Sequence, residues 1–145
     1  VVLIDPDPHV CEMLRGILSA EGHSVWVAGN GAQGLEAARA LPCDVALIGP
    51  PLPDMDSLEA ITTLKESVPQ AQAIALTEFS SLGWAIEAMR RGAFGYLLKP
   101  IYPGLSLLTI ERALERKRLW EENRQMGREL KKALSELSHM QEIAA

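Results

Sequence analysis

The stretch that decides the fold is residues 44–56, which read DVALIGPPLPDMD. Its first part, Val45–Ile48, is a short apolar run without polar alternation, and such a run predicts a strand that is buried on both faces of a sheet. Four more short apolar runs occur along the chain, at Val1–Ile4, Val25–Ala28, Ala73–Leu76 and Tyr96–Leu98. Because segments with helical periodicity separate these runs, the pattern predicts an α/β fold with a parallel sheet.

The segments between the predicted strands have the features of amphipathic helices. The first is expected at Pro8–Ala20, where Asp7 can cap the amino end. Its apolar residues recur at spacings of three and four, and they are Val10, Met13, Leu14, Ile17 and Leu18. Three further helices are predicted at 32–41, 57–68 and 81–91, with Asp56 as the cap of the helix at 57–68. A fifth helix is predicted to begin near Gly104.

Ligands of open parallel sheets bind beyond the carboxyl ends of the strands. Polar or otherwise distinctive residues stand at several of these ends, namely Asp5, Asp7, Gly49, Thr77, Lys99 and Pro100. We therefore expect a functional site in residues 1–103 to lie along this edge.

Four separated motifs at these strand ends resemble the receiver (CheY-like) domains of two-component response regulators. The motifs are VVLIDPDP at 1–8, DVALIGPPLPDMD at 44–56, IALT at 74–77 and GAFGYLLKP at 92–100. The resemblance covers residues 1 to about 103. It implies a doubly wound, flavodoxin-like sheet of five parallel strands in the order 2-1-3-4-5. It also implies a cis peptide bond between Lys99 and Pro100.

The resemblance also implies a chemistry that this chain has lost in part. In active receivers, an aspartate at the end of the third strand accepts a phosphoryl group, and Mg²⁺ is held by that aspartate and an acidic pair after the first strand. By position, the acceptor falls on Gly49 and the second acid of the pair on Pro6. Neither residue offers a carboxylate. We therefore expect a pseudo-receiver that is not an enzyme and has no metal or other cofactor, with a remnant pocket made of Asp5, Pro6, Asp7, Thr77 and Lys99.

Other uses can be predicted for the residues that remain. Lys99 is expected to form an ion pair with Asp5 in place of the missing cation, and Thr77 to hydrogen-bond to nearby backbone. Asp54 and Asp56 are the alternative phosphoryl acceptors, although a capping role is favoured for Asp56. A receiver phosphorylated at Asp54 or Asp56 is thus the alternative function.

A glycine motif favours a different class of protein. Gly29, Gly31 and Gly34 form G-x-G-x-x-G after a predicted strand, as in dinucleotide-binding enzymes. That motif should follow the first strand of the fold, and an acid should end the next strand, whereas Asp44 precedes its strand. The dipeptide Asn30-Gly31 is instead predicted to form a turn with positive φ, and a nucleotide-binding enzyme remains a distant alternative.

The last part of the chain predicts a long helix that ends in a coiled coil. From Gly104 one helix could continue to about Ile143, a length of about 60 Å. Its first apolar residues, Leu107, Leu108, Ile110 and Leu114, are expected to pack on the body of the domain. A seam with alternating spacings of four and three follows, formed by Leu119, Asn123, Met126, Leu130, Ala133, Leu137, Met140 and Ala144. The pairing could be parallel or antiparallel, and the alternative is a single helix that packs on another domain.

The flanks of this seam differ from each other. One flank holds Glu115, Glu122, Glu129 and Glu136, and the other holds Trp120, Gly127, Leu134 and Gln141. The stretch IERALERKRLWEENRQMGREL at 110–130 resembles the linker that follows receivers in NtrC-like regulators, and similar helices lead into histidine kinases. His139 is not followed by the acid and proline of a kinase phosphoacceptor motif.

Composition narrows the class of protein. The formal net charge of the chain is −5, and the run Arg116, Lys117 and Arg118 is expected to be a solvated helix face, so no nucleic-acid partner is predicted for this part of the chain. No apolar run approaches the roughly 18 residues of a membrane span. Cys11 and Cys43 lack the spacing of metal ligands, and so do His9, His23 and His139. Two cysteines far apart in the sequence fit a reducing compartment, so we expect a cytoplasmic localisation. Because the chain begins at Val1, we interpret it as part of a longer protein.

Together these patterns predict a receiver-like domain at 1–103 and a final helix that extends into a coiled-coil linker at 104–145. The predicted function is protein interaction and homodimerisation in bacterial signal transduction, with an output domain elsewhere in the protein. We expect the fourth helix, fifth strand and fifth helix to form a second contact face, on which Trp84, Met89 and Tyr96 lie.

Overall fold

The computed structural model describes residues 1–144 and, residues 79 and 142–144 apart, their side chains. Within these residues, five parallel strands form one sheet in the order β2-β1-β3-β4-β5. The strands are β1 (Val2–Ile4), β2 (Trp26–Ala28), β3 (Val45–Ile48), β4 (Gln72–Glu78) and β5 (Gly95–Lys99). The sheet confirms the predicted flavodoxin-like topology.

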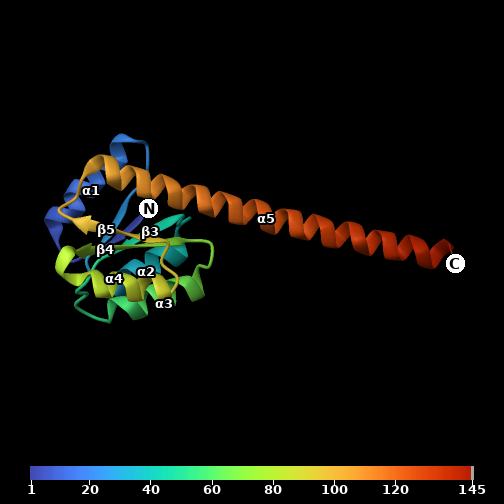
Figure 1. Ribbon diagram of the computed structural model, residues 1–145, viewed down its shortest axis with the longest axis horizontal. Helices are drawn as coiled ribbons and strands as arrows, with labels where there is room; N and C mark the ends of the chain where they lie inside the picture. The colour runs from blue at the N-terminus through green and yellow to red at the C-terminus, as the bar shows by residue number, and fades with distance from the viewer. Residues whose placement is uncertain (145) are drawn as a thin grey trace.

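Helices cover both faces of the sheet, as Figure 1 shows. They are α1 (Pro8–Ala20), α2 (Gly31–Ala40), α3 (Ser57–Ser67), α4 (Leu82–Arg90) and α5 (Pro103–Ala144). Helices α1 and α5 lie on one face, and α2, α3 and α4 lie on the other. A short 3₁₀ turn, η1 (Phe79–Ser81), precedes α4, so that α4 begins one residue later than predicted.

The core consists of two layers because successive strand residues point to opposite faces. Ile4 and Ile48 pack toward α2 and α3, whereas Leu3 and Leu47 pack toward α1 and α5. All four side chains are completely buried. This double burial explains why the strand sequences are apolar without alternation.

Helix α1 forms as predicted. The Asp7 carboxylate accepts hydrogen bonds from the backbone N–H groups of His9, at 2.9 Å, and Val10, at 3.4 Å. Leu14 and Leu18 are completely buried, and Cys11 joins them in the core. Met13 and Ile17, which were predicted on the same stripe, are half-buried.

The predicted positive-φ turn at Asn30-Gly31 is wrong. Asn30 has a φ of −142° and caps α2, since its side chain accepts a hydrogen bond from the Gln33 N–H at 2.9 Å. Gly31 begins the helix, and a Cβ atom there would lie 2.5 Å from Sδ of Met55. A Cβ atom on Gly34 would overlap the Ile4 side chain. The glycine spacing therefore permits close packing of α2.

Helix α5 has two parts. The part within 103–117 packs on the body, where Ile110 and Ala113 are completely buried and Leu107 and Leu114 are half-buried. Leu108 is 43% exposed, so its predicted contact with the body is wrong. It lies two residues, or roughly 200° around the helix, from Ile110.

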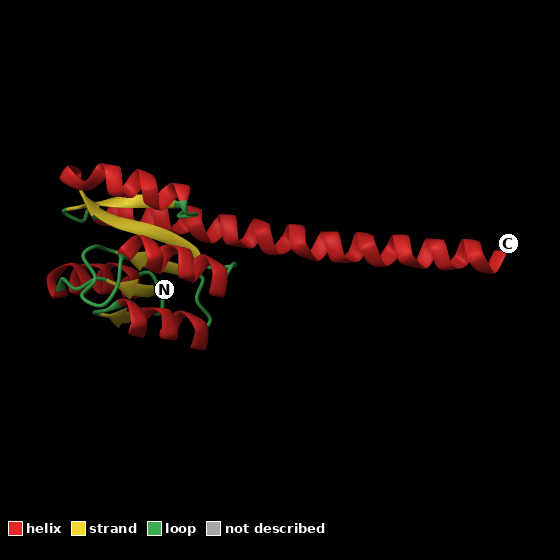
Figure 2. Ribbon diagram, turned by 90° about the horizontal axis from the view of Figure 1, so that it is seen from below, coloured by secondary structure: helices red, strands yellow, loops and turns green. Residues whose placement is uncertain are grey.

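The second part of α5 extends away from the body, as Figures 1 and 2 show. All side chains described from Arg118 to Gln141 are exposed. The helix has 42 residues, which corresponds to about 63 Å. Even so, no helix in the described chain has an apolar stretch that would allow it to span a bilayer.

The predicted solvated face at Arg116, Lys117 and Arg118 is wrong for Lys117. Its ammonium forms ion pairs with Asp44 and, at 3.2 Å, with Glu121. Although burial lowers the pKa of Lys117, the hydrogen bonds to these two carboxylates raise it above its ordinary value. This ion pair ties α5 to the body at the point where the helix leaves it.

Candidate functional site

The predicted edge residues converge at the carboxyl ends of β1, β3, β4 and β5. Asp5 follows β1, and its side chain is completely buried. One oxygen, Oδ1, accepts a hydrogen bond from the Asp7 N–H at 2.8 Å. The geometry thus holds the carboxylate in the centre of the edge, beside Gly49 and Lys99.

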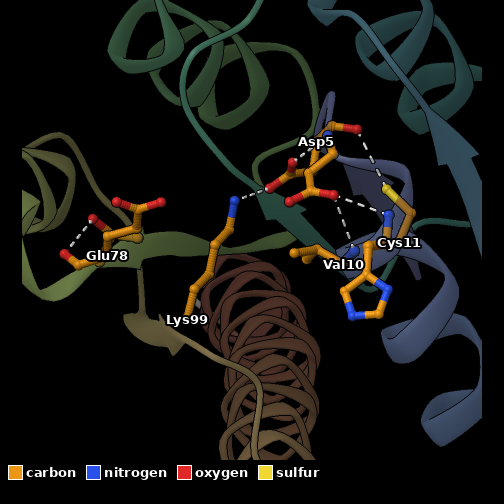
Figure 3. Close-up of polar contacts among 8 residues, drawn as sticks. Asp5, Val10, Cys11, Glu78 and Lys99 are labelled. Atoms are coloured by element: carbon orange, nitrogen blue, oxygen red, sulfur yellow. Dashed lines mark hydrogen bonds and ion pairs between the residues drawn. The ribbon is translucent and has the colours of Figure 1, made fainter.

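Lys99 approaches the other oxygen of this carboxylate, as Figure 3 shows. Its Nζ lies 2.8 Å from Oδ2 of Asp5, and only 15% of the Lys99 side chain is exposed. The predicted ion pair is therefore present. Within the described residues Oδ2 accepts no regular hydrogen bond, so the ammonium charge is the main compensation for burying it.

Gly49 leaves a space that Asp5 fills. A Cβ atom on Gly49 would overlap Oδ2 of Asp5, and it would lie 2.9 Å from Cγ of the same side chain and 3.3 Å from Cβ of Leu76. The present position of the Asp5 carboxylate is therefore incompatible with any side chain at residue 49. Residue 49 must therefore be glycine as long as Asp5 keeps this position.

The Thr77 side chain hydrogen-bonds to nearby backbone. Its side chain is buried, and Oγ1 lies 3.2 Å from the carbonyl oxygen of Ser81 and 3.3 Å from that of Glu78. The hydroxyl donates to this pair of carbonyl groups. This bonding confirms the prediction that Thr77 hydrogen-bonds to nearby backbone.

Both of the alternative acceptor acids bind helix amino ends. Asp54 accepts hydrogen bonds from the N–H groups of Gly31, at 2.8 Å, and Ala32, at 2.9 Å. These backbone bonds, that of Ala32 first, lower the pKa of Asp54. Asp56 caps α3 as predicted, because it accepts a bond from the Leu58 N–H at 2.7 Å.

The capping of α2 by Asp54 could not be predicted from local sequence. Its two donors lie 23 and 22 residues away along the chain. Only the approach of the β3–α3 loop to the start of α2 brings them together.

Cys11 is a contributor to this site that the sequence analysis did not identify. Its Sγ donates to the carbonyl oxygen of Asp5 at 3.3 Å and so supports the backbone that carries the buried carboxylate. Burial, followed by the charges of Asp5 and Asp7, raises the pKa of this thiol to about 11. Cys11 is therefore a protonated packing residue.

The residues at this edge do not fit the Mg²⁺ ion that active receivers use. Mg²⁺ prefers hard oxygen ligands in octahedral geometry. Gly49 and Pro6 supply no side-chain oxygen, and the Lys99 ammonium already lies 2.8 Å from Oδ2 of Asp5. Among the described residues, there is no group of three or more His, Cys, Asp or Glu side chains that could hold a metal.

The predicted contact face is only partly on the surface. Met89 and Tyr96 are exposed, but Trp84 is half-buried and packs against the core beneath α4. The place of Trp84 on the contact face stays a prediction. Further exposed apolar residues occur on the same three elements and their connection, namely Ile86, Tyr102, Leu105 and Leu108.

The predicted seam residues lie on the exposed part of α5. Leu119, Met126, Leu130, Leu137 and Met140 each expose about half or more of their surface. Asn123 and Ala133 are exposed as well, and the side chain of Ala144 lies outside the described residues. A single chain therefore leaves this whole apolar stripe in contact with water.

Comparisons with known proteins agree with the topology. A family model described as "Response regulator receiver domain" matches residues 1–110. The chain is 33% identical over 121 residues to the transcriptional regulatory protein ZraR of Klebsiella oxytoca, covering 83% of this chain and 27% of that protein. It is 27% identical over 130 residues to the regulatory protein AtoC of Escherichia coli, covering 90% and 28%. The chain thus spans about a quarter of the length of these relatives.

Two solved structures are similar over most of their length. The receiver domain of NtrX from Brucella abortus has a TM-score of 0.75 and 26% identity, with coverage of 79% of this chain and 97% of that one. A solution structure described as the beryllofluoride-activated NtrC4 receiver domain dimer has a TM-score of 0.74 and 28% identity, with coverage of 80% and 96%.

Proposed function

Because the chain belongs to the response regulator receiver domain family of two-component signalling, we propose that it is a pseudo-receiver, which works as a protein-interaction and dimerisation module and is not phosphorylated at residue 49. The observation that carries this proposal is the Asp5 carboxylate, which occupies the volume next to Gly49 where an acceptor side chain would stand.

The chemistry of the edge supports an inert site. A phosphoryl acceptor must be a nucleophile with room for an incoming phosphoryl group, and Gly49 has no nucleophilic atom. Lys99, the cation that would contact phosphoryl oxygens, is already paired with Asp5 at 2.8 Å. Thr77 donates its hydroxyl to backbone carbonyl groups. Each remaining group of the pocket thus has a partner that does not depend on phosphorylation.

The exposed stripe on α5 supports self-association. Burial of apolar side chains such as Leu130 and Leu137 against a second helix would remove them from water. A parallel pair would place the flank with Glu122 and Glu129 opposite the flank with Gly127 and Leu134. An antiparallel pair would place that glutamate flank against its own copy, and like charges would repel. We therefore propose a parallel homodimer.

A parallel pair would also bring the two bodies to the same end of the coiled coil. Leu105 and Leu108 are exposed on the first turns of α5, and Tyr96 is exposed on β5. These residues belong to the predicted contact face of α4, β5 and α5, which lies on the body, about 16 Å or more along the helix from Leu119. We propose that this face adds a second contact between the two copies.

The relatives suggest what the module controls. ZraR and AtoC are named as regulatory proteins, and the matched part is about a quarter of each. We propose that this chain occupies the same place in a longer cytoplasmic regulator. Its last helix would then transmit dimer geometry to an output domain.

Mass spectrometry after treatment with a phosphodonor tests the proposal. The chain is incubated with Mg²⁺ and acetyl phosphate, and its intact mass is measured beside that of a receiver that has an aspartate at the end of its third strand. We expect the control receiver to gain a phosphoryl group and this chain to remain unmodified.

Variants of the alternative acids make the outcome specific. A phosphoryl adduct that appears in the unaltered chain and disappears in Asp54→Asn or Asp56→Asn would establish the alternative function. Beryllofluoride, a mimic of the phosphoryl group, gives a second readout, because binding at the edge would change the amide spectra of β1, β3 and β5.

A further inference from the structure

A hollow lies at the amino-terminal edge of the sheet, opposite the edge that holds Asp5, at the point where α5 leaves the body. It has a volume of about 430 Å³, and its lining comes from helices α3, α4 and α5, from the start of β4 and from the loops that precede β4 and β5. The lining includes Lys65, Gln72, Phe94, Arg116 and Trp120. None of these residues belongs to the edge around Asp5, so this hollow is separate from the site described above.

The hollow contains positive charge without a carboxylate. Lys65 and Arg116 both line it, and the complete lining holds no Asp or Glu. Neither residue forms an ion pair with a carboxylate of the described chain, whereas the adjacent Lys117 is paired with Asp44 and Glu121. The hollow thus holds two cations and no acid in a chain whose formal net charge is −5. It produces a local positive potential.

Lys65 is fixed in this position. Its ammonium donates hydrogen bonds to the carbonyl oxygens of Pro69, at 3.2 Å, and Ala71, at 2.9 Å. Burial, followed by the charge of Arg116, lowers the pKa of Lys65. The Lys65 side chain also passes close to the turn at Gly92, which has a φ of +107°. A Cβ atom placed on Gly92 would lie 3.4 Å from Cγ of Lys65. The cation is therefore held in place before any ligand arrives.

Aromatic surface accompanies the charge. The Arg116 guanidinium lies 5.8 Å from the centre of the Phe94 ring, and Arg124 lies 5.2 Å from that of Trp120. Trp120 also lines a neighbouring open hollow of about 620 Å³, together with Arg124 and Arg128. Glu121 is the one carboxylate that lines this neighbouring hollow, and it forms an ion pair with Lys117 at 3.2 Å.

From this arrangement we infer that the hollow binds a nucleotide, with phosphate oxygens between Lys65 and Arg116 and the planar base against Trp120. Guanidinium and ammonium groups form strong charge-assisted hydrogen bonds with phosphate. An indole ring offers a surface on which a base can stack, and stacking of this kind contributes about 1–3 kcal/mol per base. A bare anion would use the cations alone, and a nucleoside would use the ring alone.

The position of the site gives the ligand a regulatory role. Trp120 follows Leu119, the first residue of the proposed seam, and Arg116 lies one turn earlier on the same helix. A nucleotide bound there would contact both the body and the base of the seam, and it would bias the direction in which α5 leaves the body. This inference is independent of the phosphorylation state of the sheet edge.

Tryptophan fluorescence tests the inference directly. Trp26→Phe and Trp84→Phe leave Trp120 as the reporter in the whole chain. The probes are ATP, GTP and cyclic di-GMP, with adenosine as a base without phosphate and tripolyphosphate as phosphate without a base. We expect saturable quenching by at least one nucleotide, with affinity about tenfold or more above that for adenosine and tripolyphosphate.

Arg116→Gln is the decisive variant, and Arg112→Gln, one turn earlier on the same helix and outside the hollow, is its matched control. We expect Arg116→Gln to weaken nucleotide binding about tenfold or more and Arg112→Gln to leave it unchanged. Circular dichroism melts check that both variants fold. The inference is overturned if no nucleotide saturates the signal, if tripolyphosphate binds as tightly as the best nucleotide, or if both variants weaken binding equally.

Discussion

The carboxyl edge of the sheet and the exposed part of α5 differ in whether their side chains have partners within the chain. At the edge, the buried Asp5 carboxylate has Lys99 and the Asp7 N–H as partners, and Thr77 bonds to backbone carbonyl groups. On α5, apolar residues from Leu119 to Met140 are exposed to water. One region has the interactions it needs within the chain, and the other lacks them.

This difference indicates where a signal can act. Proteins change state where two arrangements are close in free energy, and an edge whose charged and polar groups are paired within the chain favours one arrangement. An exposed apolar stripe gains free energy from a partner, so its state depends on association. We therefore expect perturbations at the edge to change folding stability and perturbations on the stripe to change assembly.

Lys99→Met should have the largest effect. It would leave the completely buried Asp5 carboxylate without its cation, and breaking a buried ion pair in this way costs about 3 kcal/mol or more. Urea unfolding followed by circular dichroism measures the loss. The double variant Asp5→Asn with Lys99→Met, which removes both charges, should recover part of it. Equal losses in the single and double variants would contradict the ion-pair explanation.

Gly49→Ala should have the next largest effect. The new methyl group would overlap the Asp5 carboxylate, and overpacking of this kind costs about 1–3 kcal/mol. Gly16→Ala is the matched control, because a Cβ atom at Gly16 meets nothing within 4 Å and alanine in a helix interior is favoured by about 0.5–1 kcal/mol. Thermal melts of the two variants should therefore shift in opposite directions.

Leu130→Glu should act on assembly alone. Leu130 is 62% exposed in the single chain, so its replacement removes no contact within the body. A charge at the seam should weaken self-association about tenfold or more, which corresponds to about 1.4 kcal/mol. Analytical ultracentrifugation measures this change, with Ser135→Glu on the outer face as the control. A monomeric parent chain would contradict the proposed dimer.

Asp54→Asn should have the smallest effect, and that effect should depend on pH. Folding lowers the pKa of Asp54 below its ordinary value of 3.8, because the carboxylate accepts bonds from Ala32 and Gly31. The stabilisation is therefore fully present above that value and is lost as the pH falls through the lower pKa of the folded state. Parent and variant should melt at different temperatures at neutral pH and should converge in strong acid.

The local sequence was sufficient to predict most of the fold. Short apolar runs identified all of the strands in the described chain, and the motif at 92–100 predicted the cis bond between Lys99 and Pro100. At the site, the resemblance to receiver domains implied that Gly49 stands at the acceptor position. The pairing of Lys99 with Asp5 was also predicted, and the ion pair is present.

Contacts between distant segments were not predictable in this way. Lys117 was expected to be solvated, but it is paired with Asp44, which lies 73 residues earlier. Leu108 was expected to be packed, yet the helix rotates it toward solvent. Trp84 was predicted on the contact face of α4, β5 and α5, and the packing of α4 leaves it half-buried there. In each case the local sequence predicts the helix, but the packing of the helix on the body decides which of its residues face the body and which face solvent.

By itself, the sequence determined which elements form and which atoms are absent, since hydrophobic period, capping residues and the lack of a side chain at Gly49 are local properties of the chain. Only the tertiary structure decided that Asp5 fills the space beside Gly49, and that Lys65 and Arg116 share a hollow. The physical reason is that the side chain which fills a given space is decided by all the helices and strands packed around that space. Such packing joins residues that are far apart in the sequence.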